Sequence, residues 1–271
     1  MDSIDVFLIG SSHTRQGYSA KLIEEDTGKS VYLLAYNGMD PVFMREILHY
    51  LIEERKIKIS HFVIEAYVNA ATSSPRMKDY RLFNDAPWNL KLRFLSVLLS
   101  EGKDIGWRQI YELVVLGGNE PLIMAPLLNS LLNRESYHGS SVNKQARGVS
   151  QEKFLMLPKD IPDTVKSEID PKQRAAYLDI FQLIRTHGLS SEFIETPMPA
   201  TVVRTTVLQE GKKRLAKFIR ENGFTYVDIA EEGRFDNQNP ALFKDWNHLS
   251  SAGREVCSRA LVARWIANST L

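Results

Sequence analysis

The residues most suited to chemistry lie near the two ends of the chain. Asp245 stands three residues before His248. At this spacing a carboxylate can accept a hydrogen bond from the imidazole Nδ1–H, which leaves Nε2 free to take a proton from a nucleophile. A nucleophile is available near the other end, because the apolar run Val6–Ile9 leads into a Gly-Ser-Ser turn that ends at Ser12. We therefore predict that Ser12, His248 and Asp245 form a catalytic triad.

The chain between these ends must bring Ser12 and His248 together. Strand-like segments at residues 6–9, 30–35 and 60–66 alternate with helical patterns at 16–26 and 41–55. The alternation resumes after Asp170-Pro171, with strand-like segments at 193–196 and 225–229 and a last helix at 251–267. Strands that alternate with helices are typical of a parallel sheet covered by helices. We predict an α/β fold with five parallel strands in a single domain over residues 1–271.

The middle of the chain has a different pattern. Residues 70 to about 149 contain no convincing strand, and their helical patches include 90–99 and 107–116. The polar stretch 136–150 is typical of a loop. We interpret residues 70–150 as a helical insertion after the third strand, on the side where open parallel sheets bind their ligands.

Composition excludes several classes of protein. The 271 residues carry a formal net charge of +1, which argues against nucleic acid as the main partner. The only cysteine, Cys257, rules out an intrachain disulfide and falls in an amphipathic pattern expected to be core. The histidines other than His248 lack the spacing of metal ligands, so we predict no metal and no organic cofactor.

An attacked carbonyl develops negative charge that needs donors already in place. The Ser12 N–H is one candidate. Gly38 follows the second strand, where the missing side chain lets its N–H approach a ligand, and Asn69 follows the third with an amide that can donate. These three groups form the predicted oxyanion hole. Gly38 is equally consistent with a simple turn glycine, and Asn69 with a strand-end cap.

These residues resemble a known superfamily. The turn ending at Ser12, then Gly38, Asn69 and the Asp-Trp-Asn-His stretch ending at His248 follow the order and spacing of the SGNH (GDSL-like) hydrolases. The resemblance implies a flavodoxin-like three-layer sandwich, a Ser12 nucleophile, Gly38 and Asn69 as oxyanion donors, and an Asp–His pair as the base. The matching residues belong to the expected sheet core near the two ends of the chain, and the resemblance does not extend to residues 70–200.

Two departures from the simplest members point to one branch. Ser11 stands where those members carry Asp, and Tyr67-Val68-Asn69-Ala70 replaces Gly-x-Asn-Asp. Such sequences look like proteins that handle acyl groups on cell-surface polymers, among them the D-alanyl transfer proteins of teichoic acids and the alginate O-acetylation proteins. This resemblance implies an acylated carbohydrate or cell-envelope polymer as substrate.

Two residues beside the triad are candidates for substrate contact. His13 follows Ser12 directly, although a lone histidine is more often structural. Trp246 lies between Asp245 and His248, where it would stack on a sugar ring or, as we favour, cover the pocket.

The leading hypothesis is a serine esterase or O-acyltransferase that works through an acyl-enzyme. One alternative is a catalytically weak polysaccharide-binding or assembly protein with the same fold, and another is an intracellular hydrolase of small esters. No apolar run reaches transmembrane length and no signal peptide precedes the first strand, so we expect a cytoplasmic protein. An N-terminal anchor removed from the sequence would instead place it outside the cytoplasm.

Overall fold

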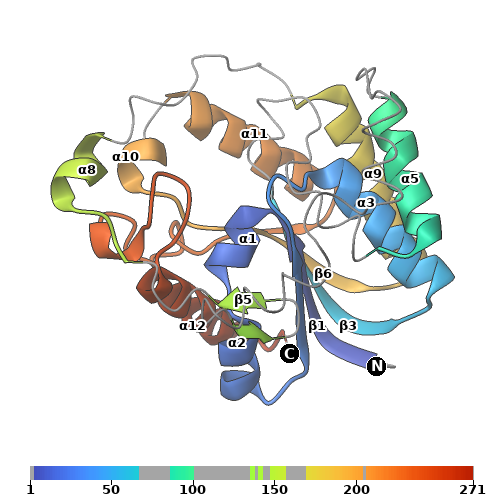
Figure 1. Ribbon diagram of the computed structural model, residues 1–271, viewed down its shortest axis with the longest axis horizontal. Helices are drawn as coiled ribbons and strands as arrows, with labels where there is room; N and C mark the ends of the chain where they lie inside the picture. Colours follow the sequence, from blue (N-terminus) through green and yellow to red (C-terminus); the bar gives the residue numbers. More distant parts are fainter. Residues whose placement is uncertain are drawn as a thin grey trace.

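A parallel five-stranded sheet forms the centre of the molecule (Figure 1). The computed structural model describes residues 3–66, 86–100, 135–137, 140–142, 147–156, 169–203 and 206–270. The strands of the sheet are β1 (Ser3–Gly10), β2 (Val31–Ala35), β3 (Lys58–Glu65), β6 (Ser190–Glu195) and β7 (Thr225–Asp228). Their order is β2-β1-β3-β6-β7, with every neighbouring pair parallel. This is the doubly wound order of flavodoxin-like folds, so the predicted fold class is confirmed.

Helices cover both faces of this sheet. On one face lie α3 (Pro41–His49), α5 (Trp88–Ser100), α9 (Pro171–Thr186) and α11 (Thr206–Glu221). On the other lie α2 (Ala20–Thr27) and α12 (Ser251–Asn268). The other helical segments within the described residues are α1 (Ser12–Gly17), the π-helix Tyr50–Glu54, α8 (Gln151–Met156), α10 (Ala200–Val203) and the 3₁₀ turn Pro240–Leu242.

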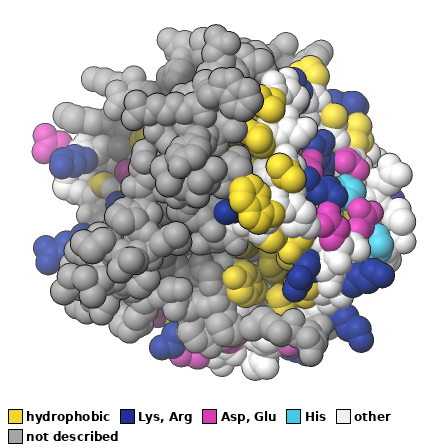
Figure 2. Space-filling model, turned by 45° about the vertical axis from the view of Figure 1, so that its right-hand side comes forward, with side chains coloured by type: hydrophobic (Ala, Val, Ile, Leu, Met, Phe, Trp, Pro, Cys, Tyr) yellow, Lys and Arg dark blue, Asp and Glu magenta, His cyan; other side chains and the backbone are white. Residues whose placement is uncertain are grey.

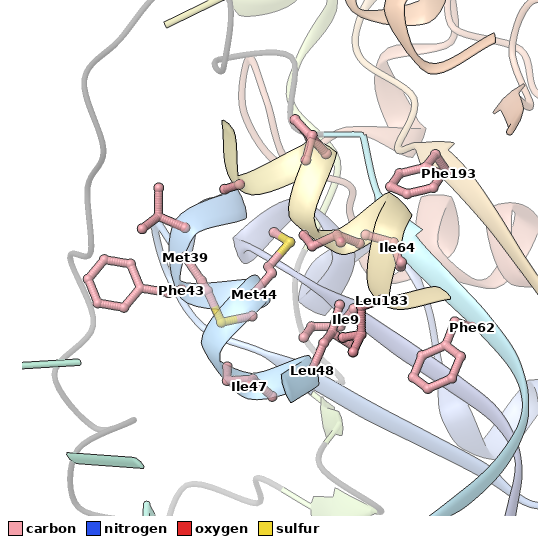
Figure 3. Packing of buried hydrophobic residues seen from close by; sticks show 14 of the residues in the cluster. Ile9, Met39, Phe43, Met44, Ile47, Leu48, Phe62, Ile64, Leu183 and Phe193 are labelled. Carbon is pink, nitrogen blue, oxygen red and sulfur yellow. The ribbon is translucent and has the colours of Figure 1, made fainter. Parts of the chain in front are cut away.

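Alternating side chains of the central strands feed two separate cores. In β1, Phe7 and Ile9 join the core under α3 and α9, whereas Val6 and Leu8 join the core under α12. Figure 3 shows the first core, where residues of α3 pack against Ile64 and Leu183. A strand buried on both faces needs a continuous apolar run, which explains the sequence of β1.

The carboxyl ends of the strands meet at one edge of the sheet. Gly10 of β1 is in register with Ala35 of β2, and Glu65 of β3 with Ile194 of β6. Residues that follow different strands are therefore brought to one edge, as the prediction for Ser12, Gly38 and Asn69 requires.

Two helix boundaries differ from those predicted. The helix predicted for 16–26 is two helices, because the Ser11 side chain caps α1 at Ser12 by accepting from the His13 N–H and the Ser19 side chain caps α2 by accepting from the Leu22 N–H. The helix predicted for 41–55 ends at His49 and continues as one π-helical turn to Glu54.

Much of the predicted insertion, including the helical patch 107–116, lies outside the described residues, and so does Asn69. Within the described part, α5 occupies the predicted helix at 90–99. The expectation of no strand was wrong, because β4 (Glu135–Tyr137) and β5 (Ser140–Val142) form an antiparallel pair. These strands have three residues each and are mostly polar, so they lack the apolar alternation that marks a strand. The single-domain organisation stays a prediction.

The face that carries α5 exposes hydrophobic side chains beside a charged area (Figure 2). Trp88 and Leu92 of α5 are both more than half exposed. The neighbouring ion pairs include Arg93 with Glu54 and His49 with Glu53. Across the described part of the chain, helices are too short or too polar to cross a lipid bilayer.

Candidate active site

The nucleophile candidate lies in a tightly constrained turn. Gly10 ends β1, and Ser12 is the first residue of α1. A Cβ on Gly10 would overlap the Thr14 hydroxyl and the Glu65 carboxylate, so this position accepts only glycine without rearrangement. Ser12 itself is half-buried.

The base candidate lies in a loop closed by backbone hydrogen bonds. Phe243 and Leu249 form an isolated antiparallel bridge, and the Lys244 N–H donates to the His248 carbonyl at 2.9 Å. Inside the loop, Asp245 Oδ1 accepts from the backbone N–H groups of Asn247 and His248 at 3.0 and 2.9 Å. The Asp245 carboxylate thus folds the loop that presents the His248 ring.

The structure brings the three predicted triad residues together. His248 Nε2 lies 2.9 Å from Ser12 Oγ. His248 Nδ1 lies 3.0 and 2.9 Å from Oδ1 and Oδ2 of Asp245. With Nδ1 protonated and held by the carboxylate, Nε2 accepts the hydrogen bond from the serine hydroxyl, which is the arrangement needed for proton transfer from serine.

The electrostatics of the pair favour an ionised Asp245. Burial opposes ionisation of this carboxyl, but the hydrogen bonds from the His248 ring and from two backbone N–H groups outweigh it and lower the pKa of Asp245. A charged carboxylate beside Nδ1 stabilises the imidazolium that forms when His248 takes a proton.

His13 lies behind this pair and is largely buried. Its ring packs edge-to-face on the ring of His248 with centroids 5.7 Å apart, and its Nδ1 lies 3.8 Å from Glu65 Oε1. Burial lowers the pKa of His13, against the opposing charge of Glu65. This setting matches a packing role for His13 more closely than substrate contact.

Trp246 is half-buried and packs on a small apolar cluster of Met198, Val202 and Leu208. Its role in covering the pocket or contacting substrate stays a prediction.

Gly38 lies in the loop after β2 with a φ of +68°, in the left-handed region that favours glycine. Its loop is tied to the nucleophile turn in two places. The Tyr36 N–H donates to the Gly10 carbonyl at 3.2 Å, and Arg15 of α1 donates to Asn37 Oδ1 at 2.6 Å. Gly38 therefore lies in a loop held beside Ser12, and its role as an oxyanion donor stays a prediction.

One residue at this site was missed by the sequence reasoning. Glu65 ends β3 and is 2% exposed. It accepts hydrogen bonds from Ser11 and Thr14, which lie on either side of Ser12 in the chain. The available signal was a carboxylate at the end of an otherwise apolar strand, which is expensive to bury unless it has partners.

Among the described residues, no group of three or more His, Cys, Asp and Glu side chains is arranged to hold a metal ion.

Comparisons with known proteins find similar solved structures only. No family model matches the chain, and no curated protein matches its sequence. A lipase/acylhydrolase from Enterococcus faecalis is 13% identical, with 99% of this chain and 97% of that chain covered and a TM-score of 0.44. A protein from Lactobacillus plantarum is 11% identical, with 98% of both chains covered and a TM-score of 0.47. An acetyl xylan esterase from Butyrivibrio proteoclasticus is 9% identical, with 98% of this chain and 64% of that chain covered and a TM-score of 0.40.

Proposed function

We propose that this protein is a serine esterase or O-acyltransferase that works through an acyl-enzyme on Ser12. The observation that carries the proposal is the hydrogen-bonded series from Ser12 Oγ through the His248 ring to the Asp245 carboxylate. A serine hydroxyl is a weak nucleophile without a base in reach, and here His248 Nε2 is in reach.

In the proposed first half-reaction, Ser12 Oγ attacks the carbonyl carbon of an ester while its proton passes to His248 Nε2. The tetrahedral intermediate then collapses, the ester C–O bond breaks, and His248 returns the proton to the leaving alcohol oxygen. Asp245 holds the ring and stabilises its positive charge throughout.

In the second half-reaction, a water or a sugar hydroxyl attacks the acyl carbon and gives its proton to His248. The bond to Ser12 Oγ breaks, and the serine regains a proton from the imidazolium. Water gives hydrolysis and a sugar hydroxyl gives transfer, so both activities share one acyl-enzyme.

The developing oxyanion needs donors, and we assign the backbone N–H groups of Ser12 and Gly38 together with the Asn69 amide. The hydrogen bonds between the Gly38 loop and the nucleophile turn support the pairing of the first two. Donors fixed before reaction stabilise charge that appears only in the transition state.

For the substrate, we propose an acylated carbohydrate or cell-envelope polymer. The motifs that resemble cell-surface acyl-transfer proteins support this choice, together with the half-buried Trp246 next to Asp245 in the chain, an aromatic residue type that stacks on sugar rings. The alternative of a small ester uses the same triad.

The proposal is tested by incubating the folded protein with a fluorophosphonate probe and with acetylated polysaccharides and aryl acetates. Labelling and ester cleavage are expected in the wild type and not in Ser12→Ala. Folded wild-type protein that neither labels nor cleaves any ester would contradict the proposal and favour a binding protein. Acetyl transfer to added saccharide would separate the transferase from the hydrolase.

A further inference from the structure

Glu65 makes several hydrogen bonds with the turn that carries Ser12. Oε1 accepts from the Ser11 hydroxyl at 2.7 Å, and Oε2 accepts from the Thr14 hydroxyl at 2.6 Å. Oε2 also accepts from the backbone N–H of Ser11 and, at 3.4 Å, from that of Thr14. These four donors belong to two residues that lie on either side of Ser12 in the chain.

We propose that Glu65 is a positioning residue that sets the place of Ser12, an inference that rests on the proposed function. Glu65 belongs to β3, which pairs with β1 and β6 on its two sides and is buried along most of its length. The carboxylate therefore attaches the nucleophile turn to a rigid part of the sheet. It holds the Ser12 hydroxyl in reach of His248 and fixes the direction of the Ser12 N–H.

The contacts select a carboxylate over an amide of the same size. All four hydrogen-bond partners of Glu65 are donors, and a carboxylate offers only acceptors. In Glu65→Gln, an NH₂ group in place of Oε2 would face the backbone N–H groups of Ser11 and Thr14, which cannot accept a hydrogen bond. An NH₂ group in place of Oε1 would make the Ser11 hydroxyl an acceptor, so its O–H would lose the carboxylate oxygen to which it donates. The side chain would keep nearly the same volume, which makes this substitution a test of hydrogen bonding with little effect on packing.

Two neighbouring residues show that the turn is built around this carboxylate. Gly10 has no room for a Cβ because the Glu65 carboxylate and the Thr14 hydroxyl occupy that space. His13 lies with its Nδ1 3.8 Å from Glu65 and its ring against His248. Glu65 therefore lies beside His13, which packs on the His248 ring, and also binds the turn that carries Ser12.

The kinetic test compares Glu65→Gln with a matched control. Glu192 of β6 is 3% exposed and accepts from Arg264 and Trp265, in a cluster that does not contact the triad. We expect Glu65→Gln to lower kcat of the folded enzyme by about 10- to 100-fold with KM little changed, because small displacements of reacting groups cost rates of this order. Glu192→Gln should lower the melting temperature and leave kcat of the folded protein near wild type.

A milder variant covers the case in which Glu65→Gln does not fold. Thr14→Val removes one donor to Glu65 while keeping the shape of the side chain, and we expect it to lower kcat by a smaller factor than Glu65→Gln, again with KM little changed. Wild-type kcat in a folded Glu65→Gln, or in Thr14→Val if only that variant folds, would overturn the proposal.

Amide hydrogen exchange tests the attachment without turnover. We expect the backbone amides of Ser11 and Thr14 to exchange faster in Glu65→Gln than in wild type or Glu192→Gln. If Glu65→Gln does not fold, the same comparison is made with Thr14→Val. Unchanged exchange would overturn the positioning role. A wild type without Ser12-dependent esterase activity would instead contradict the proposed function, and the exchange result would then decide whether Glu65 anchors the turn.

Discussion

The Oγ of Ser12 and the Nε2 of His248 lie 2.9 Å apart, although 236 positions separate the two residues in the sequence. The contact joins the turn after strand β1 to the loop before the last helix, α12. Serine and histidine at such a distance form a hydrogen bond that suits proton transfer, and the Asp245 carboxylate on the far side of the ring completes the series.

Replacing the nucleophile should separate activity from folding. We expect Ser12→Ala to abolish esterase activity and probe labelling while the melting temperature changes little, because Ser12 is only half-buried. Ser11→Ala should be far milder in activity, since it keeps the nucleophile and removes only one of the four donors to Glu65. An inactive Ser11→Ala together with an active Ser12→Ala would mean that the nucleophile has been assigned to the wrong serine.

The base should be as essential as the nucleophile. His248→Ala should be as inactive as Ser12→Ala, and the double variant no worse, because the two residues act as a unit. The measurement is the residual rate of ester cleavage in each single variant and in the double variant. Losses that multiply in the double variant would argue against a shared proton transfer.

The triad was predictable because each member follows a local pattern. A Gly-Ser-Ser turn after an apolar strand and an Asp three residues before a His are visible in the sequence, and the alternating elements imply a parallel sheet whose strand ends meet. Glu65 was not found, because its four donors lie more than fifty positions away in the chain. The start of α1 at Ser12 depends on a capping bond of Ser11, and the polar strands β4 and β5 have no apolar pattern.

A second buried charge cluster lies at the carboxyl ends of β6 and β7. Lys212 of α11 pairs with Glu195 and Asp228, and the Tyr226 hydroxyl donates to Glu195. Burial raises the pKa of Glu195 to about 7, against the opposing charge of Lys212. Between its ordinary value of 4.5 and about 7, the folded protein therefore binds more protons at this position than the unfolded chain does.

It follows that Glu195 should make stability fall as pH rises across this range. The measurement is the free energy of unfolding in urea from pH 4 to 8. Glu195→Gln removes the part of its pH dependence that comes from Glu195, so the wild type should lose stability relative to the variant as pH rises. His13, whose pKa is lowered by burial, contributes a slope of opposite sign in both proteins and cancels in the difference. A constant difference between the two proteins over the whole range would contradict the assignment.

Asn69 distinguishes an oxyanion donor from a strand-end cap. As a donor, Asn69→Ala should lower kcat by about 10²–10³ with KM little changed, because the bond forms to charge that appears in the transition state. As a cap, the same change should lower stability by roughly 1 kcal/mol and leave kcat near wild type. Measuring kcat and the melting temperature on one preparation decides between the two. A stable variant with full kcat would leave the N–H groups of Ser12 and Gly38 as the assigned donors.

The central claim is that Ser12 carries the acyl group, and intact-protein mass spectrometry tests it most directly. The protein is mixed with a reactive aryl acetate, quenched in acid within seconds, and then digested to locate the added mass. The account predicts one added acetyl group on the peptide that contains Ser12, present in wild type, absent in Ser12→Ala and strongly reduced in His248→Ala. An acetyl group on another residue, or equal acetylation of Ser12→Ala, would contradict it.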